Sequence, residues 1–592
     1  MIPVLDRPLV QFGLATAAVL ILPLVMRSGT LASEILIFGL AVAACNLLLG
    51  YTGLLSFGQG IFFGIGSYVA GLGLVRAGLP APVMLAVSLS VGALVAAVVG
   101  WISIRRQGVY FVMLTLAFSQ MFYFLAYTFS GITGGDNGFL DIPRPTLVGT
   151  RLTDPWTYYA YVAVLFLVLF AALQRVALST FGRTLLAIRD NEARAGAIGY
   201  PVRAFKVAAF AISGAVTAFA GALHAMLIGV APLSNIDYHT SETLLIMTII
   251  GGSANLFASL LGAGAYLLAA DALSEIWPRW LLALGLLLIV ITLFLQRGLW
   301  GLIERAIALV TQAPPPDDPA RPVVTPPRRP RTGSRPMSAP LLATEALGVR
   351  YGSFVALQDV TLRIAENSVH SIIGPNGAGK TTLFHALTGR IAPSGGRITL
   401  GGRDITRTSD HERVRLGLAR SFQVTSLFPT LSVRENLRLA AQGKTPWQAL
   451  PPWRRTEANR PALAMAEAML ERLDLTRVAL RAAGELSHGQ QRRLEVGMAM
   501  AAAPKVILLD EPTSGMGIDD IAAMTVLIRD LGRDHTVLFI EHNMGIVMNI
   551  SDTVTVMRAG RVLVEGPPGR VRDDPEVRRA YLGNMITGDL VP

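Results

Sequence analysis

A glycine-rich stretch beyond the middle of the chain has the residue types and the spacing that bind phosphate groups. It fits the pattern G-x-x-x-x-G-K-[ST] through Gly374, Gly379, Lys380 and Thr381. A short apolar run precedes it and a helical pattern follows it, so backbone N–H groups at the helix start can hold a phosphate. We expect the lysine to contact the β- and γ-phosphates of ATP and the threonine hydroxyl to bind Mg²⁺. The expected nucleotide contacts of this loop are Gly374, Pro375, Asn376, Gly377, Ala378, Gly379, Lys380, Thr381 and Thr382.

Two adjacent carboxylates further along the chain could complete a hydrolytic site. Asp510 and Glu511 directly follow the apolar run at 506–509 in "KVILLDEPTS". A carboxylate at the end of a buried strand can hold Mg²⁺, and the one beside it can polarise an attacking water. One alternative is that the acid pair has no catalytic role, because such pairs are common after strands. The other is that 374–382 is a glycine-rich turn in which the lysine occurs by chance. The order of the two motifs along the chain favours ATP binding and hydrolysis over both alternatives.

The composition indicates that these motifs belong to a membrane protein. Of 592 residues, 52% are hydrophobic and only 15% are charged. Charges are scarce before about residue 300 and dense after 312, so we expect a membrane half followed by a soluble half. The net charge of +11 fits loops that face an anionic lipid bilayer better than it fits nucleic acid binding. Cys45 is the single cysteine, so the chain has no intrachain disulfide, and its apolar surroundings predict a buried thiol.

Apolar runs long enough to span a bilayer predict a polytopic helical domain of roughly eight to ten helices. The longest run is expected to hold two helices, broken at Gly251–Gly252 or at Gly262. The runs lie at 9–26, 31–50, 61–77, 82–104, 109–128, 156–177, 207–231, 243–276 and 279–296. Glycine clusters at 50–71 and 131–139 indicate close helix packing, or else a broken helix beside a substrate path.

Basic residues predict the orientation of this domain. They gather around Arg105, between Arg175 and Lys206, and around Arg297, and the positive-inside rule places all three loops in the cytoplasm. The second loop, at 179–206, reads "STFGRTLLAIRDNEARAGAIGYPVRAFK". Its mixture of apolar and charged residues predicts a short amphipathic helix over 185–200, either a solvated loop helix or a coupling helix docked on an ATPase. The ATPase motifs downstream favour the coupling helix.

A proline- and arginine-rich segment divides the chain. Residues 312–340 show no apolar periodicity, which predicts an extended, disordered linker. We therefore expect a transmembrane domain over 1–311 and a soluble domain over 341–592.

A stretch in the soluble half identifies a family. "LSHGQQRRLEVGMAM", starting at Leu486, resembles the signature motif of ABC transporter ATPases. The resemblance implies an α/β P-loop fold in which Tyr351 stacks on adenine, Gln423 in "ARSFQ" is the Q-loop glutamine and His542 in "LFIEHNM" is the switch histidine. It further implies that each ATP is bound between two paired cassettes. It also assigns roles to residues of this chain. These are Glu511, His542 and Gln423 in catalysis, Thr381, Gln423 and Asp510 as Mg²⁺ ligands, and Ser487, Gly489 and Gln490 on nucleotide of a partner cassette.

Both halves resemble one subfamily, the ABC importers of branched-chain amino acids. The soluble half carries "ALQDVTL", "LSVRENL" and "AYLG", and the membrane half carries "GYTGLLSFGQGIFFGIGSYVAG", "TGGDNGF" and "TIIGGSANLFASLLGAG". These resemble an ATP-binding subunit and a type II-like importer permease, here fused with the permease first. Two positions depart from the ABC pattern. His488 replaces a glycine of the signature. Gly517 replaces the acid or amide of the D-loop, and this second departure puts communication between paired ATP sites in doubt.

The resemblance implies ATP-driven import of a small amino-acid-like solute, with branched-chain amino acids as the family default. It also implies a bacterial cytoplasmic (inner) membrane, with the ATPase on the cytoplasmic side. Partners would be a second permease and ATPase half, heteromeric by family precedent, and an extracytoplasmic solute-binding protein. A half-size ABC exporter and an ATP-gated sensor without net transport are the alternatives. The larger number of apolar runs and the single long coupling loop disfavour the exporter.

Overall fold

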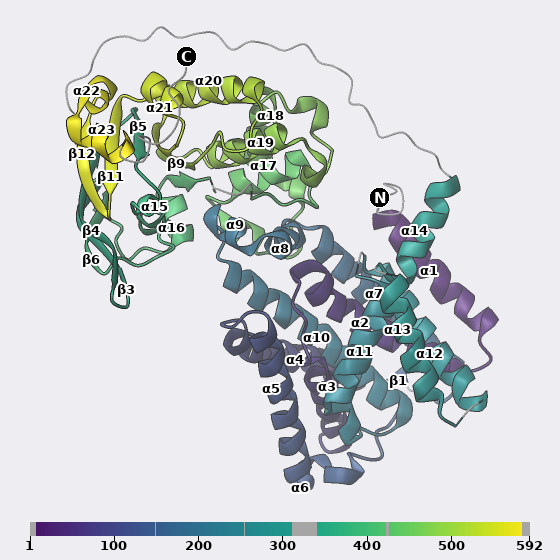
Figure 1. Cartoon of the computed structure of the whole chain (residues 1–592). Helices are drawn as coiled ribbons and strands as arrows, with labels where there is room; N and C mark the ends of the chain where they lie inside the picture. The colour runs from purple at the N-terminus through teal and green to yellow at the C-terminus, as the bar shows by residue number, and fades with distance from the viewer. Residues whose placement is uncertain are drawn as a thin grey trace. The chain divides into compact units, whose positions relative to one another are not determined.

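The computed structural model describes residues 8–147, 150–253, 255–276, 278–295, 297–310, 340–421 and 426–582. Its chain divides into two compact units, each described here by itself (Figure 1). The helical unit comprises Met1–Arg189, Arg203–Pro315 and Leu450–Thr456, and the α/β unit comprises Asp190–Val202, Pro316–Ala449 and Glu457–Pro592. Of the expected linker, 312–340, all but Pro340 lies outside the described residues.

Helices form wherever the sequence has the apolar runs that predict them. The main helices of this unit are α1 (Pro8–Val25), α2 (Gly29–Thr52), α3 (Gln59–Val75), α4 (Ala81–Ser103), α5 (Val109–Thr128), α7 (Pro155–Leu178), α8 (Thr180–Asp190), α10 (Val202–Ile228), α11 (Tyr238–Gly251), α12 (Phe257–Ile276), α13 (Trp280–Phe294) and α14 (Gly298–Val310). A one-turn helix α6 (Ser130–Thr133) and a pair of two-residue strands, β1 (Thr146–Leu147) and β2 (Thr150–Arg151), lie between α5 and α7. The run at 243–276 does hold two helices, which separate at Gly252, where φ is 98°.

Six helices in the described part of the chain are long and apolar enough to cross a membrane, namely α2, α4, α5, α7, α10 and α12. The expectation was eight to ten, and the difference has a simple cause. α1, α3 and α13 are shorter apolar helices, and the 14 residues of α11 extend only about 21 Å, less than a bilayer core. The chain is thus a membrane protein with several candidate spans.

Two helices form the centre of the helical unit. Most of α2 and α10 is buried, and α2 packs against α7 and α12. The Cys45 thiol on α2 is buried, as its apolar surroundings predicted. Close packing explains one glycine of the cluster at 50–71: a Cβ at Gly66 of α3 would overlap the backbone of Ala218 on α10. α4, α5 and α13 instead expose many large apolar side chains, as expected for helices that face lipid.

The α/β unit is built on two sheets. One is antiparallel, in the order β4 (Phe354–Ile364), β3 (Leu342–Tyr351), β6 (Gly395–Leu400), β7 (Arg403–Asp404). The other has the order β12 (Arg561–Gly566), β11 (Thr553–Arg558), β5 (Val369–Ile373), β10 (Thr536–Ile540), β9 (Val506–Asp510), β8 (Leu418–Arg420), and all its neighbours are parallel except β11 and β12. The central strands β5, β9 and β10 are buried along their whole length, as expected for a sheet covered on both faces.

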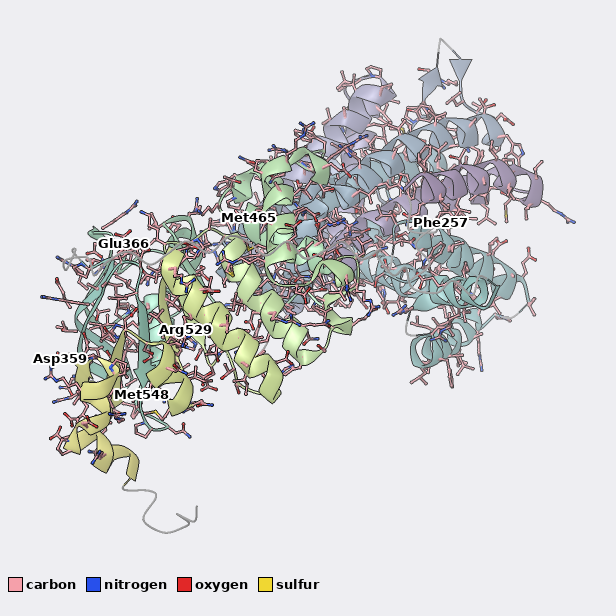
Figure 2. The ribbon with its side chains drawn as sticks, turned by 90° about the horizontal axis from the view of Figure 1, so that it is seen from above. Phe257, Asp359, Glu366, Met465, Arg529 and Met548 are labelled. Atoms are coloured by element: carbon pink, nitrogen blue, oxygen red, sulfur yellow. The ribbon has the colours of Figure 1, made fainter. Side chains whose placement is uncertain are left out.

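Helices complete this unit. They are α9 (Glu192–Ala197), α15 (Lys380–Leu387), α16 (Asp410–Arg415), α17 (Val433–Gln442), α18 (Arg460–Arg472), α19 (His488–Ala501), α20 (Ile518–Asp534), α21 (Met544–Ile550), α22 (Pro568–Asp573) and α23 (Pro575–Leu582). Figure 2 marks α20 and α21 by the labelled side chains of Arg529 and Met548. The Arg529 guanidinium donates to the backbone and side-chain oxygens of Asn549, at 3.1 and 3.2 Å, and so ties these two helices together.

The prediction of one helix over 185–200 is wrong, because the segment forms two. α8 ends at Asp190, and α9 begins after Asn191, whose backbone is extended. The Asn191 side chain accepts a hydrogen bond from the N–H of Arg194 at 2.9 Å. Asparagine competes with helix continuation in this way and starts a new helix instead.

Candidate ATP-hydrolysis site

The phosphate-binding loop follows the buried strand β5 and leads into α15. Gly374, Gly377 and Gly379 have φ of 154°, 81° and 95°, a region of backbone conformation that favours glycine. Lys380, the first residue of α15, folds back over the loop, and its Nζ donates to the carbonyl oxygens of Gly374 at 2.7 Å and Pro375 at 3.1 Å. The ammonium is thereby held against the backbone of the loop.

The open side of this loop carries the remaining expected contacts. Asn376, Gly377 and Thr381 are exposed, whereas Ala378 is buried. Burial lowers the pKa of Lys380, while the nearby negative charges of Glu511 and Asp510 favour its protonated form. The loop therefore has the exposed Thr381 hydroxyl and backbone N–H groups beside the largely buried ammonium of Lys380, a combination that suits a polyphosphate.

Parallel pairing brings the ends of three strands to one edge of the sheet, beside this loop. Asp510 ends β9, and its register partner on β10 is Ile540. Arg420 ends β8, and its Nη2 donates to Asp510 Oδ2 at 3.2 Å with both side chains buried. Burial raises the pKa of Asp510, and the charge and hydrogen bond of Arg420 counteract that rise. The carboxylate thus lies beside the Arg420 charge at the carboxyl edge of the sheet, where α/β proteins bind ligands.

Glu511 lies next along the chain in an unusual backbone conformation. Its φ is 47°, in the left-handed region that costs a non-glycine residue roughly 1–2 kcal/mol. Its N–H donates to the carbonyl of Ile540 at 3.0 Å, and its Oε1 lies 2.8 Å from His542 Nε2. A carboxylate and an imidazole at this distance can orient a water and hold its proton.

A second glutamate fixes the two loops that carry this pair. The buried Glu541 accepts hydrogen bonds from the N–H of His542 at 2.8 Å and from the N–H of Thr513 at 3.0 Å. It also accepts from the Thr513 hydroxyl. The positions of Glu511 and His542 therefore depend on one buried carboxylate between their loops.

The signature residues stand at the start of α19. Ser487 caps this helix: its Oγ accepts from the N–H of Gln490 at 3.3 Å, and Gln490 Oε1 accepts from the N–H of Ser487 at 3.1 Å. A Cβ at Gly489 would overlap the carboxylate of Asp520 on α20, so any larger residue there would require that side chain to rotate away. Within the described residues, no hydrogen bond or ion pair joins Ser487, Gly489 or Gln490 to the loop 374–382. The expected site residues therefore fall into two separate groups.

Comparison with known proteins assigns both halves of the chain. A model of the permease component of branched-chain amino acid transport systems matches residues 29–295. A model of ABC transporters matches 357–514, and one of branched-chain amino acid ATP-binding cassette transporters matches 561–585. A branched-chain amino acid transport ATP-binding protein of Pseudomonas aeruginosa is 42% identical over 255 residues, which are 42% of this chain and 99% of that protein. The chain belongs to the branched-chain amino acid family of ABC transporters.

Other relatives of this ABC transporter chain match the same half. The corresponding ATP-binding protein of Escherichia coli K12 is 40% identical over 256 residues, 42% of this chain and 99% of that protein. A lipopolysaccharide export ATP-binding protein of Acidithiobacillus ferridurans is 38% identical over 249 residues, 42% of this chain and 98% of its own length. A solved ABC cassette in its ADP conformation is 31% identical, covers 42% of this chain and 100% of its own, and has a TM-score of 0.36.

The two units of this ABC transporter can now be named. The helical unit holds most of the permease. The α/β unit holds the ATP-binding cassette, an ATP hydrolase coupled to transport, together with Asp190–Val202 of the permease sequence. The expected fold class, a polytopic helical domain followed by an α/β P-loop cassette, is confirmed. ATP binding follows from the family of the cassette.

The cassette places most of the expected site residues. Lys380, Asp510, Glu511 and His542 gather at the carboxyl edge of the sheet. Tyr351, for which adenine stacking is expected, ends β3 and is 48% exposed. The expected Q-loop residue Gln423 lies outside the described residues.

Sequence reasoning missed four buried residues of the cassette. Arg420, Arg492, Glu495 and Glu541 hold the backbone and charges of the acid pair. All four lie within stretches that resemble the family, "ARSFQ", "GQQRRLE" and "LFIEHNM". No local pattern distinguishes them from solvent-exposed charges.

Proposed function

We propose that the chain is one permease–ATPase half of an importer that carries a branched-chain amino acid, or a similar small solute, across a bacterial cytoplasmic membrane. One observation carries the proposal: a single chain matches the permease component and the cassette of the same transport family. The cassette alone would not carry it, because an export ATP-binding protein is almost as similar as the amino acid transport ones. The clustering of basic residues in three loops supports a cytoplasmic cassette.

The residues at the carboxyl edge of the sheet support a role for each in hydrolysis. Lys380 would bind the β- and γ-phosphates, and Tyr351 would stack on adenine. Glu511, aided by His542, would orient the attacking water and accept its proton. Hydrolysis would then proceed by in-line attack on the γ-phosphate, which the loop amides hold in place.

The oxygen ligands present fit Mg²⁺. Carboxylate and hydroxyl oxygens are the groups that this ion binds, and the Asp510 carboxylate and Thr381 hydroxyl are such groups. Asp510 would hold the ion in exchange for part of its contact with Arg420, and Gln423 is the third expected ligand. When bound, the ion would offset the charge that develops on the phosphates.

A second cassette would complete the site. No hydrogen bond or ion pair joins the signature residues Ser487, Gly489 and Gln490 to the loop 374–382 in the described part of their own chain, which supports their acting on ATP of a partner. Another ABC cassette, 24% identical over 38% of this chain and 98% of its own with a TM-score of 0.34, was solved as a dimer bound to ADP and Pi. The partner half would be a homologous chain, and an extracytoplasmic binding protein would deliver the solute.

Uptake by proteoliposomes tests this function. The chain, its partner half and a binding protein would be reconstituted, and radiolabelled leucine added outside with ATP enclosed. Leucine should accumulate, and unlabelled isoleucine or valine should compete with it. Extrusion of preloaded solute would establish the exporter instead, and ATP hydrolysis stimulated by the loaded binding protein without uptake would establish the sensor.

A further inference from the structure

The segment Asp190–Val202, which joins α8 to α10, belongs to the cassette unit. Several of its side chains form ordinary docking contacts there. The Asp190 carboxylate accepts from the N–H and hydroxyl of Thr430 at 2.9 and 2.6 Å. The Tyr200 hydroxyl donates to the carbonyl of Leu439 at 3.1 Å. These contacts attach the segment to the cassette but lie away from the acid pair.

One residue of the segment makes a different kind of contact. Arg194 of α9 is completely buried. Its Nη1 donates to the carbonyl of Arg420 at 3.2 Å, and its Nη2 donates to the carbonyl of Glu495 at 3.2 Å. The same guanidinium lies 3.9 Å from Glu495 Oε1, and that carboxylate is also completely buried. A buried arginine needs such partners, since its desolvation is costly.

The Glu495 carboxylate also binds a second arginine. Its Oε2 accepts from Arg492 Nη1 at 2.6 Å. Arg492 in turn donates to three consecutive carbonyls at the end of β9. These are the carbonyls of Asp510 at 2.9 Å, Glu511 at 2.7 Å and Pro512 at 3.3 Å.

The carbonyls that Arg492 holds flank the strained residue of the site. Glu511 has left-handed backbone geometry, which persists only where the surroundings impose it. The Arg492 guanidinium binds the carbonyls on both sides of that residue and its own. A planar, rigid fork of donors is suited to fix a short stretch of backbone in this way.

A second branch leads to the other acid. Arg194 holds the backbone of Arg420, and the Arg420 guanidinium pairs with Asp510 Oδ2 at 3.2 Å. Both branches are buried from α9 to the acid pair, so solvent does not screen them. Arg194 is thus the first residue of both branches: Glu495 and Arg492 separate it from Glu511, and Arg420 separates it from Asp510.

We propose that Arg194 is a positioning residue for ATP hydrolysis, acting through Glu495 and Arg492 on the backbone of Glu511. The inference rests on the proposed role of Glu511 and adds the means by which a loop of the permease sequence governs it. When α9 is seated, the buried chain of charges is complete and Glu511 is aimed at the γ-phosphate. When α9 is displaced, Glu495 and the backbone of Arg420 lose a partner, so Arg492 is less firmly held and the Glu511 carboxylate is no longer fixed.

Steady-state ATP hydrolysis by the full-length chain in lipid nanodiscs, with the partner half, tests the proposal. We expect Arg194→Met to lower kcat by roughly 10- to 100-fold, the loss expected for a small misplacement of a catalytic group. The KM for ATP and the binding of a fluorescent ATP analogue should change less than about twofold, because the phosphate-binding loop is untouched. Arg194→Lys should recover part of the rate.

Tyr200→Phe is the matched control, since it removes a docking hydrogen bond of the same segment but no member of the charged chain. Its kcat should stay within about twofold of the unaltered protein. Glu495→Gln should lower kcat as Arg194→Met does, and the double variant should lose little more, because both interrupt one path.

Three outcomes would overturn the proposal. The first is an equal kcat for ATP hydrolysis in Arg194→Met and Tyr200→Phe. The second is a double variant whose loss in kcat is the product of the losses in Arg194→Met and Glu495→Gln. The third is a change in the KM for ATP of Arg194→Met without a change in its kcat. Glu511→Gln, measured in the same series, separates this failure from a failure of the proposed function. If Glu511→Gln still hydrolyses ATP, the role of Glu511 is wrong whatever Arg194 does. If only Glu511→Gln is inactive, the role of Arg194 alone is wrong.

Discussion

Replacing Glu511 with glutamine tests the proposed hydrolytic mechanism most directly. Glutamine has the same size and keeps an oxygen that can accept from His542 Nε2, 2.8 Å away in the native pair. The backbone contact of its N–H with the carbonyl of Ile540 is also unchanged. What is lost is the negative charge that accepts the proton of the attacking water.

The size of the effect follows from that loss. A positioned general base contributes typically 10²- to 10⁴-fold, which is about 3–5 kcal/mol of activation free energy. Binding of ATP should persist, because the loop 374–382 and Lys380 are unaltered. Removing a carboxylate beside the phosphates lowers repulsion, so the affinity for ATP should be equal or higher.

Two measurements on the reconstituted transporter check this prediction. Phosphate release at saturating ATP gives the rate, and equilibrium titration with a fluorescent ATP analogue gives the affinity. Glu345→Gln, an identical change at an exposed position of β3, is the control and should leave both values unchanged. If the Glu511→Gln transporter kept more than about a tenth of the native rate, Glu511 would not be the base of this site.

Two further predictions concern packing and pH. A Cβ at Gly489 would overlap the Asp520 carboxylate. Gly489→Ala would force that side chain into another rotamer and should destabilise the cassette by about 0.5–1.5 kcal/mol in chemical denaturation, whereas Gly517→Ala, which would meet no atom within 4 Å, should change its stability by less than about 0.5 kcal/mol. Burial lowers the pKa of His370 to about 4, so it stays neutral in the fold while the unfolded chain takes up a proton below about pH 6.5. Stability should therefore fall as the pH drops from 6.5 to 4, by about 2 kcal/mol at pH 5. The free energy of unfolding, measured by hydrogen exchange of β5 amides, should fall by about 2 kcal/mol less in His370→Gln than in the unaltered protein between pH 7 and pH 5. An equal fall in the two proteins would contradict the reasoning.

Local patterns in the sequence predicted much of this protein. The loop 374–382 is contiguous, and its glycines, lysine and flanking apolar strand appear together in one short stretch. The apolar runs of the permease likewise predicted their helices, because hydrophobic length alone determines them. Even the break after Gly251 followed from a local pair of glycines.

The buried charges could not be predicted in the same way. Arg492 and Glu495 stand three residues apart on a helix, a spacing that usually indicates a solvated surface pair. Their burial depends on β9 and α9, which lie far away in the sequence. The end of α8 at Asp190 was missed for a related reason, since the capping contact of Asn191 competes with an otherwise continuous amphipathic pattern.

Helix α19 gives the cassette a property that neither of its motifs has alone. Its first turn presents Ser487 and Gly489, the residues proposed to bind ATP of a partner, and its next two turns carry Arg492 and Glu495, which fix Glu511 of the same chain. About 12 Å of rigid helix separates Ser487 from Glu495. In a cassette pair, a nucleotide bound at Ser487 and Gly489 would therefore shift Arg492 and Glu495 on the same helix. The two ATP sites could then be cooperative without any loop movement between them, because one rigid helix would link nucleotide binding at one site to the position of the catalytic carboxylate at the other.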